Sequence, residues 1–212
     1  LIDARKQFLN GLKGITDPEE KREAITQTFY KDVFGLIVRE TGARYLLQGT
    51  NYTDIEETVA GVKRQHNILE QIGINTEEAY GYKVIEPLIQ LRKPAVRKIA
   101  KELNLPEEIY RRPPFPGPAL AARVIGKVTA ERIEIARKAT KIVEEELEQA
   151  QLYDKVWQAY AAVGDDKAVG VVGDERKYGN IVMIRVVDSI DAMTADWTRL
   201  PHGLLEKISN RI

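Results

Sequence analysis

The sequence predicts an α/β protein in two parts, a parallel sheet with helices outside it followed by a small α+β domain. Three observations predict this. Helix-like and strand-like segments alternate from residue 18 to residue 104, a pattern typical of parallel sheets. Four prolines between Arg111 and Pro118 then prevent any regular element from continuing. A long helical pattern and several strand-like segments follow in the second half.

Charge and composition narrow the classes of function. The 32 basic residues balance 32 acidic ones, so an anion site has to be a local cluster. The chain has no cysteine, which excludes thiolate chemistry and is typical of a reducing compartment, so we expect a cytoplasmic protein. Its histidines are His66 and His202, which excludes a multi-histidine zinc site, and we expect no resident metal site.

The first predicted helix has clear end signals. Asp17 is a typical N-cap, and Pro18 occupies the first helical position. Apolar residues recur at helical spacing from residue 21 to residue 40, and Gly42 is a plausible C-cap. Residues 45–47 then predict a short buried strand.

Gln48, Gly49 and Thr50 follow that strand directly. Ligands bind at the carboxyl ends of parallel strands, and a glycine lets a ligand approach the backbone. The same residues also fit an ordinary strand-to-loop turn. The pattern therefore predicts either a nucleotide-binding turn or a simple connection.

Residues 52–66 predict a loop with a short helix. Its basic part, around Lys63 and His66, fits a lid that closes over phosphates or a solvated basic loop. The acidic residues Asp54, Glu56 and Glu57 are candidates for holding Mg²⁺ between phosphates, although acidic loops are common.

The remaining elements alternate up to the proline-rich segment and change in type after it. Residues 82–88 predict a strand, and residues 93–104 predict an amphipathic helix in which Val96, Ile99 and Leu103 share a face. We place the domain boundary between Arg112 and Pro113, giving domains 1–112 and 113–212. The second domain is predicted to contain a helix at 129–149, strands at 157–163, 168–172 and 178–187, turns at 164–166 and 173–174, and a last helix from Pro201. The long helix has an apolar stripe, made up of Ile133, Ile135, Ala136, Ala139, Ile142, Val143 and Leu147.

The proline-rich segment lies between Arg112 and Arg123. It fits a rigid wall whose guanidinium groups bind a phosphate or carboxylate, or a stiff linker with solvated arginines. Residues 170–174 lack the spacing of a Walker phosphate loop, so we interpret them as a strand-ending turn. The carboxylates of Asp188, Asp191 and Asp196 favour a capping or interface role over a metal site.

Several motifs together resemble those of the GMP synthases and occur in the same order. They are DPEEKR at 17–22, QGT at 48–50, IEPL at 85–88, RPPFPGPALAAR at 112–123, GVVGDERKY at 170–178 and SIDAMTA at 189–195. The resemblance implies a partial adenine-nucleotide alpha-hydrolase-like (ATP-pyrophosphatase) parallel sheet in residues 1–112. It implies a dimerisation and XMP-binding domain in residues 113–212.

The family makes GMP from XMP. ATP adenylylates the C2 oxygen of XMP with release of pyrophosphate, and ammonia then displaces AMP; Mg²⁺ and basic groups stabilise the charge on the leaving pyrophosphate. The resemblance implies that Lys63 and His66 belong to the catalytic lid. It implies an ATP site at Gln48, Gly49 and Thr50, and an XMP site at Arg112, Pro116, Gly117, Arg123 and Gly173.

The chain departs from the family pattern at several places. It contains neither the SGGVDS phosphate loop nor the closing KPPATIEWE-like segment, and the lid KSHHNVGGLP corresponds to KRQHNILE at 63–70. Ala119 stands where the family has a glycine. We therefore expect a piece truncated at both ends and inactive alone, with a glutamine amidotransferase domain or subunit as ammonia donor.

Two alternatives to a ligase stay open. The chain fits a non-catalytic nucleotide-binding and dimerisation module, or a divergent ATP-pyrophosphatase paralogue with another substrate. In each case we expect a homodimer through the C-terminal domain, because large aromatic side chains fall on a small domain: Trp157, Tyr160, Tyr178 and Trp197.

Overall fold

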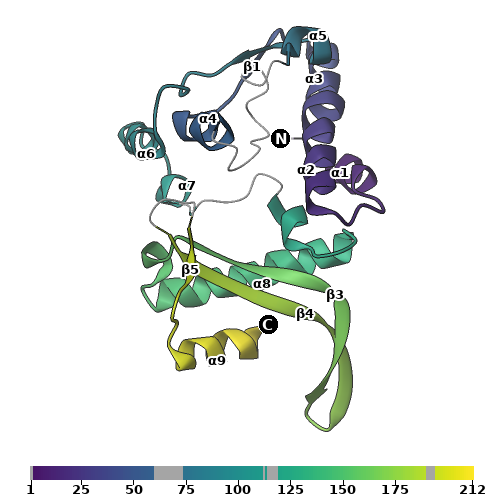
Figure 1. Cartoon of the computed structure of the whole chain (residues 1–212), viewed down its shortest axis with the longest axis vertical. Helices are drawn as coiled ribbons and strands as arrows, with labels where there is room; N and C mark the ends of the chain where they lie inside the picture. The colour runs from purple at the N-terminus through teal and green to yellow at the C-terminus, as the bar shows by residue number, and fades with distance from the viewer. Residues whose placement is uncertain (1, 60–73, 112, 114–118, 190–193) are drawn as a thin grey trace. The chain divides into compact units, whose positions relative to one another are not determined.

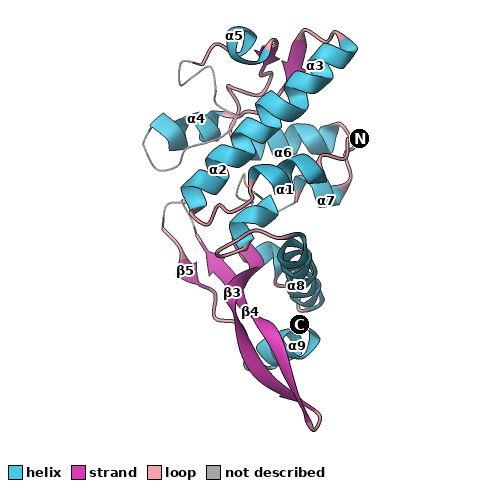
Figure 2. Cartoon of the chain, turned by 90° about the vertical axis from the view of Figure 1, so that its right-hand side faces the viewer, coloured by secondary structure: helices cyan, strands magenta, loops and turns pink. Residues whose placement is uncertain are grey.

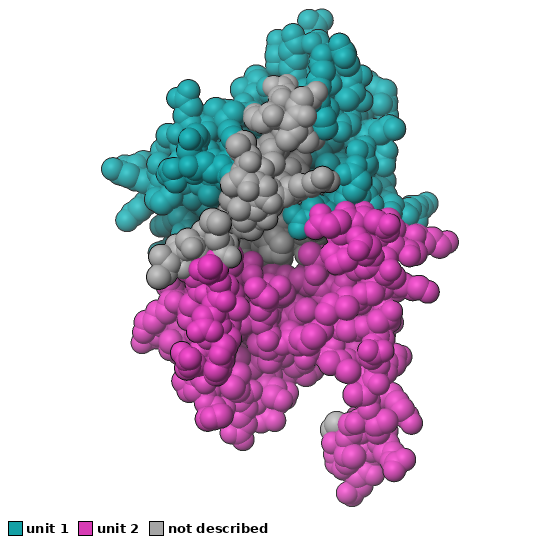
Figure 3. All heavy atoms as spheres, viewed as in Figure 1, with its two compact units in different colours: residues 1–11, 22–112 teal, residues 12–21, 113–212 magenta. Residues whose placement is uncertain are grey.

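The computed structural model describes residues 2–59, 74–111, 113, 119–189 and 194–212. The chain divides into two compact units (Figure 3), which are treated separately below. Unit 1 consists of residues 1–11 and 22–112, and unit 2 of residues 12–21 and 113–212. The functional assignment of the two predicted domains stays a prediction.

Unit 1 consists of short helices and one pair of short parallel strands (Figure 1). Its strands are β1 (Tyr45–Leu47) and β2 (Lys83–Ile85). The helices are α1 (Arg5–Gly11), α2 (Pro18–Gln27), the π-helical η1 (Thr28–Phe34), α3 (Gly35–Thr41), α4 (Tyr52–Val59), α5 (Thr76–Tyr80), α6 (Lys93–Glu102) and α7 (Glu107–Tyr110). The first residues of α2 belong to unit 2.

The predicted end signals of the first helical stretch are confirmed. The Asp17 carboxylate accepts hydrogen bonds from the backbone N–H groups of Glu19 (2.8 Å) and Glu20 (3.0 Å). Gly42 ends α3 with φ +69°, and its N–H donates to the Val38 carbonyl. The π-helical turn η1 between α2 and α3 was not predicted, because its side chains have ordinary helical spacing.

The predicted burial of β1 is wrong. Leu47 is 71% exposed, and Tyr45 is exposed as well. In the described part of unit 1, β1 pairs with β2, and no further strand extends this two-stranded sheet. The predicted apolar face of α6 is likewise not buried, since Ile99 and Leu103 are exposed. Strand β2 is also shorter than predicted, because a turn begins at Glu86, whose carbonyl accepts from Ile89 N–H.

The buried core of unit 1 is aromatic. Tyr30 from η1 and Tyr82, which precedes β2, are fully buried. The Tyr82 hydroxyl donates to the Tyr30 carbonyl (3.3 Å). The rings of Tyr80 and Tyr82 stack at 6.0 Å between centroids, and Phe34 packs against the cluster of Tyr30 and Tyr82. Burial raises the pKa of the Tyr30 and Tyr82 hydroxyls above the ordinary value of 10.0.

Unit 2 is a long helix packed on an antiparallel sheet (Figure 2). The strand order is β3–β4–β5. Its elements, besides the first turn of α2, are the 3-10 helices η3 (Ala119–Arg123) and η4 (Tyr153–Lys155), the helices α8 (Ala130–Gln149) and α9 (His202–Arg211), and the strands β3 (Gln158–Val172), β4 (Glu175–Asp188) and β5 (Asp196–Trp197).

The core of unit 2 confirms the predicted apolar stripe of the long helix. Ala136, Ala139, Val143 and Leu147 recur at helical spacing and are buried. They pack against the inward face of β3 and β4 and against α9, which begins after Pro201 as predicted. Burying a valine or leucine side chain, such as that of Val143 or Leu147, stabilises a domain by about 1.5–3 kcal/mol.

The predicted turn at residues 164–166 is wrong. The two predicted strands on either side of it form the single strand β3. Val163 pairs with Val182, but Lys167 pairs with Asn180, so residues 164–166 form a bulge in a continuous ladder. The turn predicted at 173–174 is confirmed: Gly173 has φ +63° and begins the two-residue connection between β3 and β4.

None of the helices that the structure describes combines the length and the low charge needed to cross a bilayer.

Candidate functional site

In unit 1, the residues predicted to bind ATP lie at the carboxyl end of β1. Gln48 N–H donates to the Ile85 carbonyl (2.9 Å), which ties the end of β1 to the end of β2. The Gln48 side-chain amide donates to Thr50 Oγ1 (2.9 Å), and Thr50 is fully buried. A Cβ at Gly49 would meet no atom within 4 Å. The structure thus places these three residues together at the sheet edge, with open space beside Gly49.

The first turn of α4 holds one of the candidate Mg²⁺ ligands. Asp54 Oδ2 accepts from the backbone N–H (3.1 Å) and the side-chain amide (3.0 Å) of Asn51. Asn51 Oδ1 in turn accepts from Thr53 N–H (3.0 Å). Asp54 is therefore part of a reciprocal cap at the start of the helix, beside the predicted ATP residues. Among the described residues, no three Asp, Glu or His side chains gather as a metal site.

An arginine that was not predicted contacts α4, the helix that follows the predicted ATP residues. Arg92 precedes α6, and its guanidinium donates to Glu56 Oε1 on α4 (2.6 Å). It also lies 5.3 Å from the centroid of the Tyr52 ring, within the range of a cation–π contact. Arg92 and Glu56 are 36 residues apart, so no local pattern connects them.

Several predicted site residues lie outside the described part of the chain. They are the lid residues Lys63 and His66 and the XMP residues Arg112, Pro116 and Gly117. Their roles stay predictions. Of the residues predicted to bind XMP, the structure describes Arg123 and Gly173, both in unit 2.

Arg123 is held inside unit 2. The residue is 2% exposed, and its guanidinium donates to Thr140 Oγ1 on α8 (2.8 Å) and lies 4.8 Å from the centroid of the Tyr160 ring. Thr140 Oγ1 also accepts from Ala161 N–H (3.1 Å). Arg123 therefore fixes η3 to α8 and β3, and its predicted contact with XMP stays a prediction.

Gly173 lies at the far end of the β3–β4 hairpin, whereas Arg123 contacts Tyr160 near the start of β3. The residues around it, Asp174, Arg176 and Tyr178, are exposed. Within unit 2, the structure does not bring Gly173 next to the buried guanidinium of Arg123.

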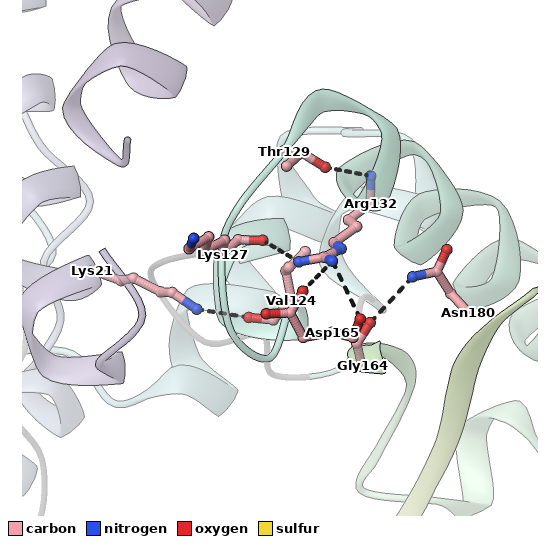
Figure 4. A network of polar contacts seen from close by, with 8 residues as sticks. All are labelled: Lys21, Val124, Lys127, Thr129, Arg132, Gly164, Asp165 and Asn180. Atoms are coloured by element: carbon pink, nitrogen blue, oxygen red, sulfur yellow. Dashed lines mark hydrogen bonds and ion pairs between the residues drawn. The ribbon is translucent and has the colours of Figure 1, made fainter. Parts of the chain in front are cut away.

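A second polar cluster in unit 2 was not predicted (Figure 4). Lys21 donates to the Val124 carbonyl (2.8 Å). Arg132 donates to the Lys127 carbonyl (2.9 Å) and forms an ion pair with Asp165 in the β3 bulge. Burial lowers the pKa of the Lys21 ammonium, partly offset by the charges of Asp17 and Asp165.

Comparison with known proteins identifies the family that the C-terminal part of the chain matches. Residues 145–212, from the end of α8 through α9, match the family described as GMP synthase C terminal domain. This region contains the β3–β4–β5 sheet of unit 2.

Whole proteins give matches over the full length of the chain. It is 49% identical over 216 residues to the glutamine-hydrolyzing GMP synthase of Pyrobaculum aerophilum, of which it covers 42%. It is 49% identical over 212 residues to a protein of Methanocaldococcus jannaschii that is named as one subunit of a glutamine-hydrolyzing GMP synthase, and it covers 66% of that subunit. The corresponding subunit of Methanothermobacter thermautotrophicus is 46% identical and also covered to 66%.

The chain belongs to the GMP synthase family. It spans less than half the length of the longer relatives and about two thirds of the relatives that are named as subunits.

Proposed function

We propose that this protein works in purine nucleotide biosynthesis as the synthetase part of a GMP synthase, converting XMP to GMP at the expense of ATP. The observation that carries the proposal is the 46–49% identity to GMP synthases along the whole chain. Identity at this level over 100% of the chain covers both units, not only the matched C-terminal domain.

The geometry of unit 1 supports an ATP site at the carboxyl edge of β1. Gly49 leaves room for a ligand against the backbone, and Gln48 and Thr50 are held on either side of it. Mg²⁺ usually binds through phosphates with one or two carboxylates. Asp54 is the nearest described acidic residue after Thr50, and a bound Mg²⁺ would neutralise charge on the leaving pyrophosphate.

In this proposal Arg112, Pro116, Gly117 and the segment around Arg123 form the XMP site, and Lys63 and His66 act from the lid. Gly173 lies at the far end of the β3–β4 hairpin, away from Arg123 within one chain, and would contribute to the site of a second copy. Arginine binds phosphate and carboxylate groups through parallel N–H bonds. Arg123 supports the site from within, since its guanidinium is buried against Thr140. A glutamine amidotransferase domain or subunit would supply ammonia, in keeping with the names of the relatives, which describe subunits of a glutamine-hydrolyzing enzyme.

Calorimetric titration tests the function most directly. We expect this chain to bind XMP, and to bind ATP with Mg²⁺ separately, with GMP and IMP as controls. Selective XMP binding would support the synthase assignment over a divergent paralogue. The protein expressed from its complete reading frame should then form GMP from XMP, ATP and ammonia. Failure of that protein to do so would overturn the proposal.

We also propose a homodimer through the β3–β4 hairpin. Its far half carries an apolar strip, defined as Val169, Val171 and Tyr178. Val169 pairs with Tyr178, and Val171 lies two residues along on the same face. All three are exposed, Tyr178 to 73%. Figures 1 and 2 both show this half of the hairpin extending beyond α8 and α9.

A second copy of the chain would cover this strip. An isolated two-stranded hairpin is marginally stable at best, whereas a partner gives its apolar face something to pack against. Light scattering should report a dimer for the unmodified chain and a monomer for Tyr178→Asp. Lys177→Asp, on the opposite face of the hairpin, should leave the dimer intact. An unchanged mass for Tyr178→Asp would exclude the strip as the interface.

A further inference from the structure

The first four residues after η3 each contact a residue outside their own segment. We define these residues, 124–127, as the connector. The contacts are Lys21 Nζ to the Val124 carbonyl (2.8 Å), Ile125 N–H to the Val163 carbonyl (2.9 Å), Asp165 against Gly126, and Arg132 to the Lys127 carbonyl (2.9 Å). Because a contact holds each residue of the connector, its backbone has one defined conformation. An ordinary surface loop does not need to be fixed in this way.

Gly126 and Asp165 fit each other closely. Gly126 has φ +77°, a conformation that L side chains rarely adopt, and a Cβ there would lie 2.6 Å from Asp165 Oδ2. Asp165 is placed by the β3 bulge, whose Gly164 carbonyl accepts from Asn180 Nδ2 (3.3 Å). The bulge thus aims one carboxylate at the connector.

Arg132 and Lys21 complete the cluster from two further elements (Figure 4). Arg132, in the first turn of α8, pairs with the Asp165 carboxylate and also donates to the Asp165 carbonyl (3.3 Å). Lys21, in the first turn of α2, is 3% exposed and reaches the connector at Val124. Burying an ammonium group away from water costs free energy, so holding the connector through a hydrogen bond from Lys21 to one carbonyl carries an energetic cost.

The connector begins one residue after Arg123. Because the connector directly follows η3, whatever fixes the connector also constrains the position of η3. Arg123 itself anchors η3 to Thr140 and Tyr160.

We propose that Lys21, Arg132 and Asp165 are positioning residues, which hold the connector and through it η3 in the place that XMP binding requires. This inference rests on the proposed function in its choice of ligand. The three side chains would not touch XMP; they would act through residues 119–127.

The test uses Asp165→Asn, Arg132→Met and Lys21→Met in the full chain, with Arg137→Met as matched control. Arg137 also pairs with a carboxylate, that of Glu134, from the same helix, but on its exposed face. We expect each of the first three variants to weaken XMP binding on the order of tenfold and the control to bind normally. ATP binding should stay within about twofold in all four, because the predicted ATP residues lie in unit 1.

Hydrogen exchange provides a second readout that needs no ligand. Amides of residues 119–127 should exchange about tenfold faster in the three variants, while those in the middle of α8 stay protected. Arg132→Lys, which keeps the cation, should restore part of the protection and serves if Arg132→Met does not fold. A lower unfolding temperature with normal XMP affinity and unchanged exchange would reduce the cluster to a stabilising role and overturn the inference.

The two proposals fail in distinguishable ways. If the unmodified chain and its complete protein bind no XMP, the proposed function fails, and exchange of residues 119–127 still decides whether the cluster positions η3. If the unmodified chain binds XMP and the three variants bind it equally well, only the positioning role fails.

Discussion

The two units differ in how they bury apolar surface. In unit 2, the long helix α8 packs along β3 and β4, and one cluster buries side chains from four elements, α8, β3, β4 and α9. In the described part of unit 1, the core cluster centres on Tyr30 and Tyr82, and apolar side chains of β1 and α6 lie in solvent.

The difference follows from the type of sheet. An antiparallel hairpin pairs with itself through a two-residue turn, so β3 and β4 form a core with the helices α8 and α9 alone. Short parallel strands need neighbours on both edges and helices on both faces. Unit 2 therefore buries apolar side chains between its own elements, whereas unit 1 depends more on contacts beyond β1 and β2.

The largest test of this comparison is a pair of leucine substitutions. Leu147→Ala removes a fully buried side chain from the core of unit 2 and should lower its free energy of unfolding by about 3 kcal/mol. Leu47→Ala, on the exposed strand β1, should change stability by less than about 0.5 kcal/mol. Both tryptophans, Trp157 and Trp197, lie in unit 2, so urea unfolding followed by tryptophan fluorescence reports unit 2, and far-UV circular dichroism reports both units.

An equal loss from the two substitutions would break the comparison. It would mean that β1 is buried in solution by something that the described residues do not include, such as a second copy of the chain. Measuring Leu47→Ala at two protein concentrations separates these cases, because stability from association depends on concentration.

A smaller effect is expected from the tyrosine core of unit 1. Tyr82→Phe removes the hydroxyl that donates to the Tyr30 carbonyl and should cost about 1 kcal/mol at neutral pH. Because burial raises the pKa of both hydroxyls in the folded state, the unfolded state releases their protons first. Stability from these groups is therefore fully present below about pH 10 and falls as the pH rises above it.

The pH dependence gives the measurement. Far-UV circular dichroism should show unit 1 losing stability as the pH rises above about 10, the ordinary pKa of tyrosine, and less steeply in Tyr82→Phe. Tyr45→Phe, which alters an exposed tyrosine of unit 1, is the control and should leave the slope unchanged. A slope that Tyr82→Phe does not alter would show that these hydroxyls are accessible in the folded protein.

Features decided by a few neighbouring residues could be predicted from the sequence. The Asp17 cap, the Gly42 end of α3 and the Gly173 turn depend on residues within about four positions, and all are confirmed. The stripe on α8 was predictable because a long helix repeats its pattern several times.

Features decided by distant partners could not. Glycine and acidic residues at 164–166 fit a turn as well as a bulge, and the bulge is held by Asn180 and Arg132, which are 16 and 33 residues away from their acceptors. Lys21 and Val124 are 103 residues apart. The candidate site divides in the same way: Gln48 and Thr50 meet within one loop, whereas Arg92 reaches Glu56 from another element.

The smallest expected effect compares the same chemistry in the two units. Thr129 caps α8 by accepting a hydrogen bond from Arg132 N–H (3.2 Å), and Asn75 caps α5 by accepting from Glu77 N–H (3.1 Å). Thr129→Ala should lower the unfolding free energy of unit 2 by about 0.5–1 kcal/mol. Asn75→Ala should loosen mainly the five-residue helix α5, because so short a helix meets the tyrosine core through little more than Tyr80. Asn75→Asp and Thr129→Ser, which keep an acceptor, should be close to neutral. Hydrogen exchange distinguishes the two results: faster exchange confined to α5 fits a locally opening unit 1, while a matching global loss in both variants would show that unit 1 unfolds as cooperatively as unit 2.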